Sequence, residues 1–237
     1  MRVVTWNIRF GVEFDTAARE LQRIDSLRDA DIVLLQEMDE AGTAAIAGMI
    51  GAGWVFRSAA AHRTTGRDFG NAILSRWPIT DAVEIGLPHR AFVQGQPRSA
   101  TRATVEVDGL AVSTYSVHTE IRSMRLEKRV EQFVALADDV RAMRAPVVVI
   151  GGDFNTVTGR DVLVLGEAMA NVGLACVSRG AGPTFRRFKR GFRLDHVFAR
   201  GLSVRAAGEA REATASDHVP LWTELTIGPR SAPTGHV

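Results

Sequence analysis

Polar side chains border several short apolar runs of this chain, at the points where the expected strands begin or end. They are Asn, Asp, Glu and His residues, the types that bind metal ions and move protons: Asn7, Glu37, His118, Asp153, Asn155, Asp195 and the pair Asp217–His218. Each one alone is commonly a cap or a turn residue. Because strand ends at one edge of a sheet bring distant residues together on rigid supports, the recurrence of this pattern predicts a shared site.

The chemistry of this set favours a hard cation and a phosphate ester. The chain has one cysteine, Cys176, which excludes an intramolecular disulfide and a cysteine-based zinc site. Carboxylate and amide oxygens suit Mg²⁺, which commonly takes one or two carboxylates together with water and substrate phosphate. A histidine beside an aspartate can carry a proton or offset negative charge, and a carboxylate can orient water. Together these groups fit attack by water on a phosphate ester.

The charge of the chain is nearly balanced, but the type of its cations is not. In 237 residues, 29 Lys and Arg stand against 27 Asp and Glu, a net charge of +2. That balance excludes a disordered polyelectrolyte and a histone-like protein. Only Lys128 and Lys189 are lysines, so arginine dominates. Either a high-GC genome or a phosphate-handling surface explains this excess, since arginine holds planar anions through two parallel hydrogen bonds.

Hydrophobic periodicity indicates short strands mixed with a few helices. Strands are expected at 2–8, 32–36, 54–58, 71–75, 101–107, 111–118, 147–150, 194–198, 203–205 and 219–227, and helices at 16–28, 43–50, 124–143 and 160–169. Asp108-Gly109 is typical of a tight hairpin turn between two of these strands. One α/β domain over residues 1–227, with helices outside two packed sheets, fits this pattern. Residues 228–237 are expected to form a flexible tail.

The sequence carries no signal-peptide pattern and no apolar run long enough to span a bilayer. We therefore expect a cytoplasmic protein, and a monomer.

Seven segments, in order along the chain, carry a family resemblance. They are TWNIR (5–9), LQE (35–37), GNAILSRWPI (70–79), VHT (117–119), GDFN (152–155), LDHV (194–197) and SDHVPL (216–221). In these segments the chain resembles the endonuclease/exonuclease/phosphatase superfamily of metal-dependent phosphohydrolases. The resemblance implies a four-layer α/β/β/α sandwich, in which two mixed sheets pack face to face with helices outside. It also implies an active site at one edge of the sheets and a Mg²⁺ cofactor, with Mn²⁺ as a possible substitute.

The resemblance also implies roles for individual residues. The metal ligands would be Glu37, Asn7 and Asp217. The catalytic residues would be His218, Asp195, Asp153, Asn155 and His118. In these roles Asp195 orients His218, Asp153 aligns the attacking water and Asn155 supports the transition state.

Three further assignments follow from the resemblance. His118 matches a second histidine of the deoxyribonuclease and phosphatase branches, and apurinic endonucleases carry a tyrosine there. Asp68 is a candidate partner for His118. Arg129 and Gln132 match a pattern of the following helix, for which a structural link between helix and sheet is the favoured interpretation.

Several arginines are candidates for substrate contacts. Arg98 and Arg102, four residues apart on an expected strand, share one face and are predicted to bind phosphate, with Asn71 as a further contact. Residues 186–193 combine five cations with Phe188 and Phe192, and from this loop Arg186 and Arg190 are predicted contacts. Such a loop suits a nucleic-acid backbone, an anionic membrane surface or a solvated surface without a partner.

Three functions remain open at this stage. The favoured one is a Mg²⁺-dependent phosphoesterase that acts by in-line water attack on a phosphodiester, either nucleic acid or a small molecule. The alternatives are a phosphomonoesterase on a sugar or lipid phosphate and a non-catalytic binding protein of the same fold. Peripheral contact with a membrane, as in sphingomyelinases, would use the two phenylalanines of the basic loop.

Overall fold

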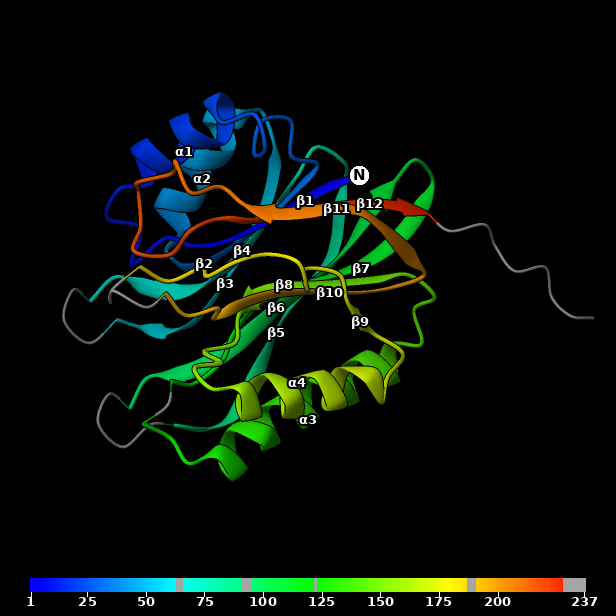
Figure 1. Ribbon diagram of the computed structural model, residues 1–237. Helices are drawn as coiled ribbons and strands as arrows, with labels where there is room; N and C mark the ends of the chain where they lie inside the picture. Colours follow the sequence, from blue (N-terminus) through cyan, green and yellow to red (C-terminus); the bar gives the residue numbers. More distant parts are fainter. Residues whose placement is uncertain (63–65, 91–94, 122, 187–190, 228–237) are drawn as a thin grey trace, which may run out of the picture.

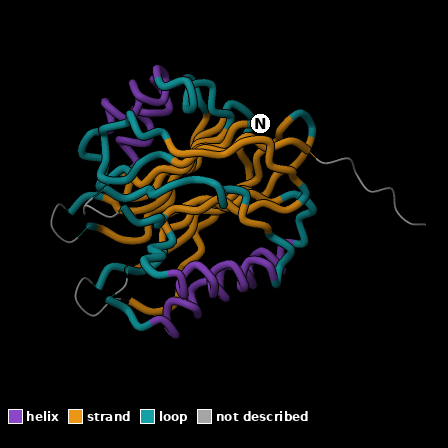
Figure 2. The backbone as a smooth tube through the Cα atoms, in the orientation of Figure 1, coloured by secondary structure: helices purple, strands orange, loops and turns teal. Residues whose placement is uncertain are grey.

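Two six-stranded sheets pack face to face in the computed structural model, with two helices covering each outer side (Figures 1 and 2). The structure describes residues 1–62, 66–90, 95–121, 123–186 and 191–227. The predicted four-layer α/β/β/α sandwich is therefore confirmed. The predicted tail at 228–237 lies outside the described residues, as do Phe188 and Arg190 of the basic loop.

Both sheets are mixed. The first has the strand order β11 (Leu202–Glu209), β12 (Leu221–Ile227), β1 (Arg2–Asn7), β2 (Ile32–Met38), β4 (Asp68–Ser75) and β3 (Gly53–Ala61). The second has the order β5 (Ile79–Arg90), β6 (Pro97–Val107), β7 (Leu110–His118), β8 (Val148–Asp153), β10 (Asp195–Arg200) and β9 (Ala175–Cys176). In each sheet the central pair is parallel, β1 with β2 and β7 with β8, and the other pairs are antiparallel.

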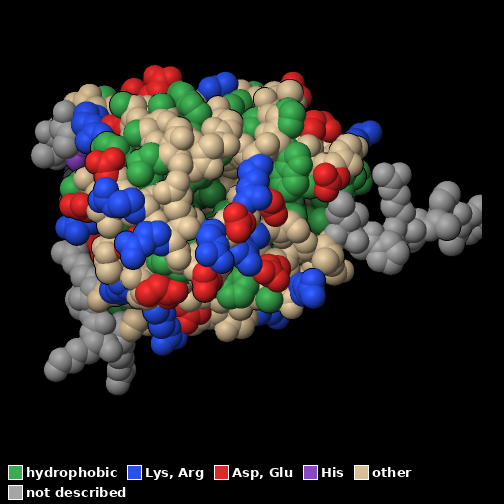
Figure 3. All heavy atoms as spheres, turned by 90° about the horizontal axis from the view of Figure 1, so that it is seen from above, with side chains coloured by type: hydrophobic (Ala, Val, Ile, Leu, Met, Phe, Trp, Pro, Cys, Tyr) green, Lys and Arg blue, Asp and Glu red, His purple; other side chains and the backbone are tan. Residues whose placement is uncertain are grey.

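Alternation along the central strands divides the core into three layers. Val4 and Trp6 of β1 pack under α1 (Phe14–Arg23) and α2 (Glu40–Ile50), whereas Val3 points into the layer between the sheets. The helices α3 (Leu126–Met143) and α4 (Gly159–Ala170) cover the other side of the second sheet. Strands buried on both faces account for the continuous apolar runs of the sequence. On the face over α1 and α2, Arg side chains lie between Asp and Glu side chains (Figure 3).

The boundaries of several elements differ from the sequence expectation. The first helix ends at Arg23, not at residue 28, because Ile24 turns to extended backbone. The second begins at Glu40, because the Asp39 side chain accepts a hydrogen bond from Gly42 N and caps it. The hairpin turn at Asp108-Gly109 is confirmed, with positive φ at both residues.

Strand register brings the polar strand ends to one edge of the sandwich. Asp153 at the end of β8 is in register with His118 of β7 on one side and Asp195 of β10 on the other. Gly152 allows this approach, since a Cβ there would lie 2.0 Å from the Val117 carbonyl oxygen. In the facing sheet Asn7 is in register with Gln36, one residue before Glu37. Backbone pairing alone thus assembles the candidate residues.

In the described part of the chain, no helix has the length and apolar character needed to cross a membrane.

Candidate active site

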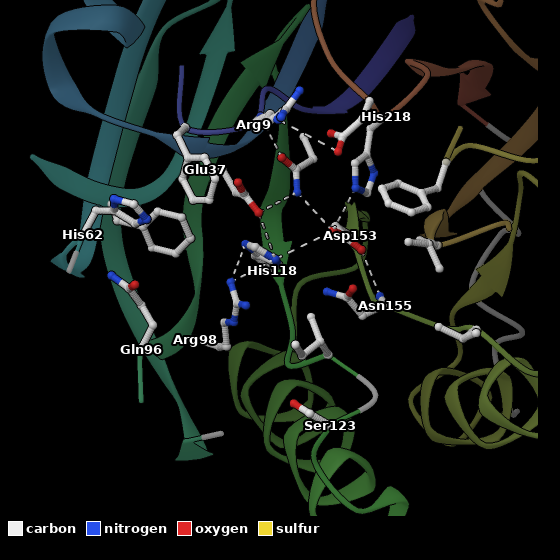
Figure 4. Close-up of a pocket in the computed structure, with 18 of the residues that line it drawn as sticks. Arg9, Glu37, His62, Gln96, Arg98, His118, Ser123, Asp153, Asn155 and His218 are labelled. Atoms are coloured by element: carbon white, nitrogen blue, oxygen red, sulfur yellow. Dashed lines mark hydrogen bonds and ion pairs between the residues drawn. The ribbon is translucent and has the colours of Figure 1, made fainter. Parts of the chain in front are cut away.

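An open pocket of about 1000 Å³ lies at this edge and receives side chains from both sheets (Figure 4). Most of the predicted site residues line it: Asn7, Glu37, Arg98, His118, Asp153, Asn155, Arg186, Asp217 and His218. The polar strand ends recognised in the sequence therefore do converge.

Glu37 and Asn7 connect the two sheets at the pocket floor. Glu37 sits at a β-bulge of β2 with φ +56, a left-handed conformation that is strained for a glutamate. Asn7 Nδ2 donates hydrogen bonds to Glu37 Oε1 at 3.2 Å and to Asp153 Oδ2 at 3.0 Å. Asn7 Oδ1 accepts from Arg9 N, which fixes the amide. One amide thus holds two carboxylates from opposite sheets close together.

Asp153 is buried and is held at both carboxylate oxygens. Its Oδ1 accepts from Asn155 N at 2.9 Å, a contact made possible by the left-handed backbone of Asn155, φ +51. Burial raises the pKa of Asp153 to about 7, an effect that the charge of His218 opposes and the charge of Asp195 reinforces. A carboxyl group that changes charge near neutral pH is suited to accepting a proton from water.

His218 is paired with Asp195 beneath the pocket. Its Nδ1 lies 2.9 Å from Asp195 Oδ2, and its Nε2 lies 3.6 Å from Asp153 Oδ2. Burial would lower the pKa of His218, but the charges of Asp195 and Asp153 and the hydrogen bond that His218 donates to Asp195 outweigh burial and raise the pKa to about 10. His218 is therefore a cation at neutral pH.

His118, unlike His218, is neutral. Arg98 Nη1 lies 3.1 Å from Nδ1 and 3.0 Å from Nε2 of its ring. Burial, together with the charges of Arg98 and His218, lowers the pKa of His118 well below its usual value. The pocket therefore holds one neutral and one protonated histidine, each within 3.6 Å of the same oxygen of Asp153.

The donor set of this pocket fits a divalent cation. Asp153, Asp195 and His218 are buried and offer ligand atoms within 4.8 Å of one another, so this group could bind a metal. Asp195 Oδ1 is buried without a hydrogen-bond partner among the described residues, and burial raises the pKa of Glu37. The free-energy cost of burying these carboxylates falls when a cation binds beside them. His218 is protonated at neutral pH and a protonated imidazole is not a ligand. The assignment of Glu37, Asn7 and Asp217 as ligands stays a prediction.

Two predicted substrate contacts lie elsewhere. Arg102 does not line the pocket: its guanidinium donates two hydrogen bonds, of 2.7 and 2.8 Å, to Asp139 on α3. Asn71 also lies outside the lining, because its Nδ2 donates to the Ser99 carbonyl at 2.9 Å and ties β4 to β6. Ser99 is in register with His118, so Asn71 supports the strand beside the site.

The remaining candidates have structural partners. The ring nitrogens of His118 contact Arg98, Glu37 and Asp153, and Asp68 instead accepts a hydrogen bond from Ser58 on β3. The predicted pairing of Asp68 with His118 is therefore wrong. Arg129 donates to the Asn155 carbonyl and to Asp161 at the start of α4, and Gln132 bridges Glu120 and Pro88. The structural interpretation of these two residues is confirmed.

Sequence reasoning missed the aromatic residues of the pocket. Phe10, His62, Phe69 and Phe185 line it, as does the amide of Gln96. The one signal available was the position of Phe10 directly after the TWNIR segment, since the other rings come from strands and loops whose packing is set by distant contacts.

Comparisons with known proteins agree with this geometry. The model of the Endonuclease/Exonuclease/phosphatase family matches residues 4–218. A UPF0294 protein of Vibrio cholerae serotype O1 is 31% identical over 234 residues, which span 96% of this chain and 78% of that protein.

Two solved structures illustrate the shared fold. A mannosyl-6-phosphatase of Bacteroides thetaiotaomicron superposes with a TM-score of 0.75 at 19% identity, over 95% of this chain and 99% of that one. Sphingomyelinase C of Streptomyces griseocarneus gives a TM-score of 0.70 at 18% identity, over 94% of this chain and 98% of that one.

Proposed function

Because the chain belongs to the endonuclease/exonuclease/phosphatase family, we propose that it is a Mg²⁺-dependent phosphodiesterase that hydrolyses its substrate by in-line attack of water. The observation that carries the proposal is the convergence of Glu37, Asp153 and His218 in one pocket, from strands and loops of both sheets. A cation site, a proton acceptor and a positively charged donor are the groups that phosphoryl transfer requires.

Each of these groups has a separate task in the proposed reaction. Mg²⁺ held by Glu37, Asn7 and Asp217, or Mn²⁺ in its place, would supply Lewis-acid stabilisation of a phosphate oxygen. Asp153, oriented by Asn7 and Asn155, aligns the attacking water and accepts its proton. His218 remains protonated and donates from Nε2 to a phosphoryl oxygen, while Asp195 holds the ring in place.

Arg98 completes the charge balance on the other side of the pocket. Its guanidinium lies against the ring of His118 in the pocket lining (Figure 4), from where it would contact the oxygens of a bound phosphate. Asn155 donates its own side-chain amide to the Thr119 carbonyl at 3.0 Å, so its loop is held rigidly beside Asp153. Rigid donors of this kind favour the transition state because they need no rearrangement during the reaction.

The shape of the pocket supports a diester rather than a monoester. Its lining has aromatic rings on two sides: Phe10 packs against His62 on one side of Glu37, and the ring centroid of Phe185 lies 5.0 Å from that of His218 on the other (Figure 4). A diester carries a group on each side of the phosphate, whereas a monoester needs only one. Because the fold also resembles that of a phosphatase, the monoester remains the alternative to be tested.

A panel of model esters tests the proposal. Bis(p-nitrophenyl) phosphate is expected to be hydrolysed with Mg²⁺ or Mn²⁺, with a higher kcat/KM than p-nitrophenyl phosphate. The reason is that only the diester has a group to place on each of the two sides of the pocket. Supercoiled plasmid added as a third substrate distinguishes nuclease from small-molecule activity. A preference for the monoester would favour the phosphomonoesterase instead. Failure of all three substrates with both metals would contradict this proposal and favour the non-catalytic binding protein.

A further inference from the structure

One side of the pocket is built from aromatic rings that take no part in the proposed attack of water on the phosphate. Phe10, His62 and Phe69 form a cluster with ring centroids 4.4 Å apart for Phe10 and His62, 5.9 Å for Phe10 and Phe69, and 5.8 Å for His62 and Phe69. We refer to these three residues as the aromatic wall. Figure 4 shows His62 on the far side of Glu37 from His218, with Gln96 beside it.

The aromatic wall adjoins the catalytic residues directly. The rings of Phe69 and His118 have centroids 5.9 Å apart, and the Arg98 guanidinium carbon lies 5.7 Å from the Phe69 centroid. A phosphate held near His118 and Arg98 would therefore place its substituent against the wall.

Phe10 is held in a conformation that folding alone does not favour. It has φ +61, between Arg9 at +45 and Gly11 at +60, so three consecutive residues are left-handed. Phe10 remains 39% exposed and lines the pocket. A bulky residue pays for left-handed backbone in strain, and such strain concentrates at ligand sites. The exposed ring thus points to a ligand.

Charge on the pocket lining narrows the chemistry of that ligand. The Arg98 guanidinium already lies 5.7 Å from the centroid of the Phe69 ring, so a second cation against this ring, such as a quaternary ammonium group, is disfavoured. An uncharged planar ring is favoured, because every nucleobase has a face that stacks on aromatic side chains.

Gln96 adds a polar group at the edge of the wall. Its Nε2 donates to the carbonyl of Ala61, the residue before His62, at 2.9 Å. This bond holds the amide in the lining, where its other donor and its acceptor suit the edge of a base. We propose that the aromatic wall with Gln96 binds the nucleobase of a nucleotide-containing phosphoester, an inference that rests on the proposed function for the position of the phosphate.

Two ligands that differ only in the base test this inference. Adenosine 5′-monophosphate and ribose 5-phosphate are titrated into the full chain by calorimetry in EDTA, where metal-dependent hydrolysis does not consume them. Adenosine 5′-monophosphate is expected to bind about tenfold more tightly, within the range of base stacking on aromatic side chains. Equal affinities, or no measurable binding of either ligand, would overturn the inference, and so would tighter binding of phosphocholine than of ribose 5-phosphate.

Variants assign the preference to the wall. Phe10→Leu keeps an apolar side chain but removes the ring face, and it is expected to abolish the preference, whereas Phe10→Trp retains it. Val12→Ala is the matched control, because Val12 is 65% exposed in the same loop and does not line the pocket. An unchanged preference in folded Phe10→Leu, checked by circular dichroism, would contradict a role for the wall.

The outcomes separate this inference from the proposed function. A preference for adenosine 5′-monophosphate without hydrolysis of bis(p-nitrophenyl) phosphate would contradict the phosphodiesterase and keep the base subsite. Hydrolysis with equal affinities for the two ligands would keep the phosphodiesterase and contradict the subsite.

Discussion

Replacing Asp153 with asparagine is expected to lower kcat for bis(p-nitrophenyl) phosphate by about 10²–10⁴-fold, the contribution of a well-positioned general base. Asparagine has nearly the same shape, and its one oxygen can still accept the hydrogen bond from Asn155 N, whereas the hydrogen bond from Asn7 Nδ2 is lost. Asparagine also loses the capacity to take a proton from water. Steady-state kinetics with Mg²⁺ measures the effect.

The same substitution has a predicted signature in stability. Burial raises the folded-state pKa of Asp153 from 3.8 to about 7, so its contribution to stability is fully present below pH 3.8 and is lost as pH rises through 7. Asparagine cannot ionise, so the stability of the variant does not fall in this way as pH rises. In EDTA, its melting temperature should therefore exceed that of the wild type at pH 8 but not at pH 4.

Asp139→Asn is the matched control for this experiment. Asp139 is a partly buried acid that pairs with Arg102 and Tyr115 outside the pocket. Its replacement should lower the melting temperature and leave kcat unchanged. Wild-type kcat in Asp153→Asn would contradict the catalytic role assigned to Asp153. A melting temperature below that of the wild type at pH 8 would contradict its burial cost.

Replacing His218 with glutamine is expected to lower kcat by about 10²–10³-fold, the cost of removing one donor that stabilises transition-state charge. The reason is that His218 acts as a cation, not as a base, when Asp195 and Asp153 raise its pKa to about 10. His196→Gln is the control, because His196 is buried among Thr156, Arg193 and Phe154 and does not line the pocket.

The pH profile distinguishes a cation from a base. If protonated His218 is required, activity falls as pH rises through about 10, and Asp195→Asn should move this alkaline limb to lower pH because it removes a charge that raises the pKa. The contribution of His218 to stability has the same direction: it is present below pH 6.5 and lost as pH rises through 10. An alkaline limb that stays in place in Asp195→Asn would contradict the assigned role.

The arrangement of the strand ends could be predicted from sequence, because apolar runs locate the ends of the strands and the polar residues found there indicate a shared site. Apolar runs fix where β1, β7 and β8 stop, and a polar residue at each stop then faces the same edge. Backbone pairing, as between His118 and Asp153, follows from the order of the strands in the sheet.

The prediction failed where a partner comes from another element. Arg98 and Arg102 share a face of β6, but Arg102 pairs with Tyr115 in the sheet and meets Asp139 of α3, while Arg98 lies one pair from His118. The alternation of side chains along a strand shows which face of the sheet each residue lies on. It does not show which helix covers that residue.

The edge strand β5 and the strained backbone at Phe10 could also not be predicted from the sequence. β5 was not predicted, since it pairs only with β6, its burial alternates poorly and Pro88 interrupts its pattern, as an edge strand tolerates. The aromatic wall depends on left-handed backbone at Phe10 and on the packing of His62 against it, neither of which leaves a periodic signal.

A Mg²⁺ titration of EDTA-treated protein, with wild type and Glu37→Gln compared side by side, tests the central claim most directly. The claim is that this pocket is a cation-dependent phosphoesterase site. We predict no hydrolysis of bis(p-nitrophenyl) phosphate in EDTA, saturable recovery with Mg²⁺ in the wild type, and a requirement for about tenfold or more Mg²⁺ in Glu37→Gln, because an amide oxygen is a weaker ligand than a carboxylate. Full activity in EDTA, or identical Mg²⁺ curves for the two proteins, would contradict it.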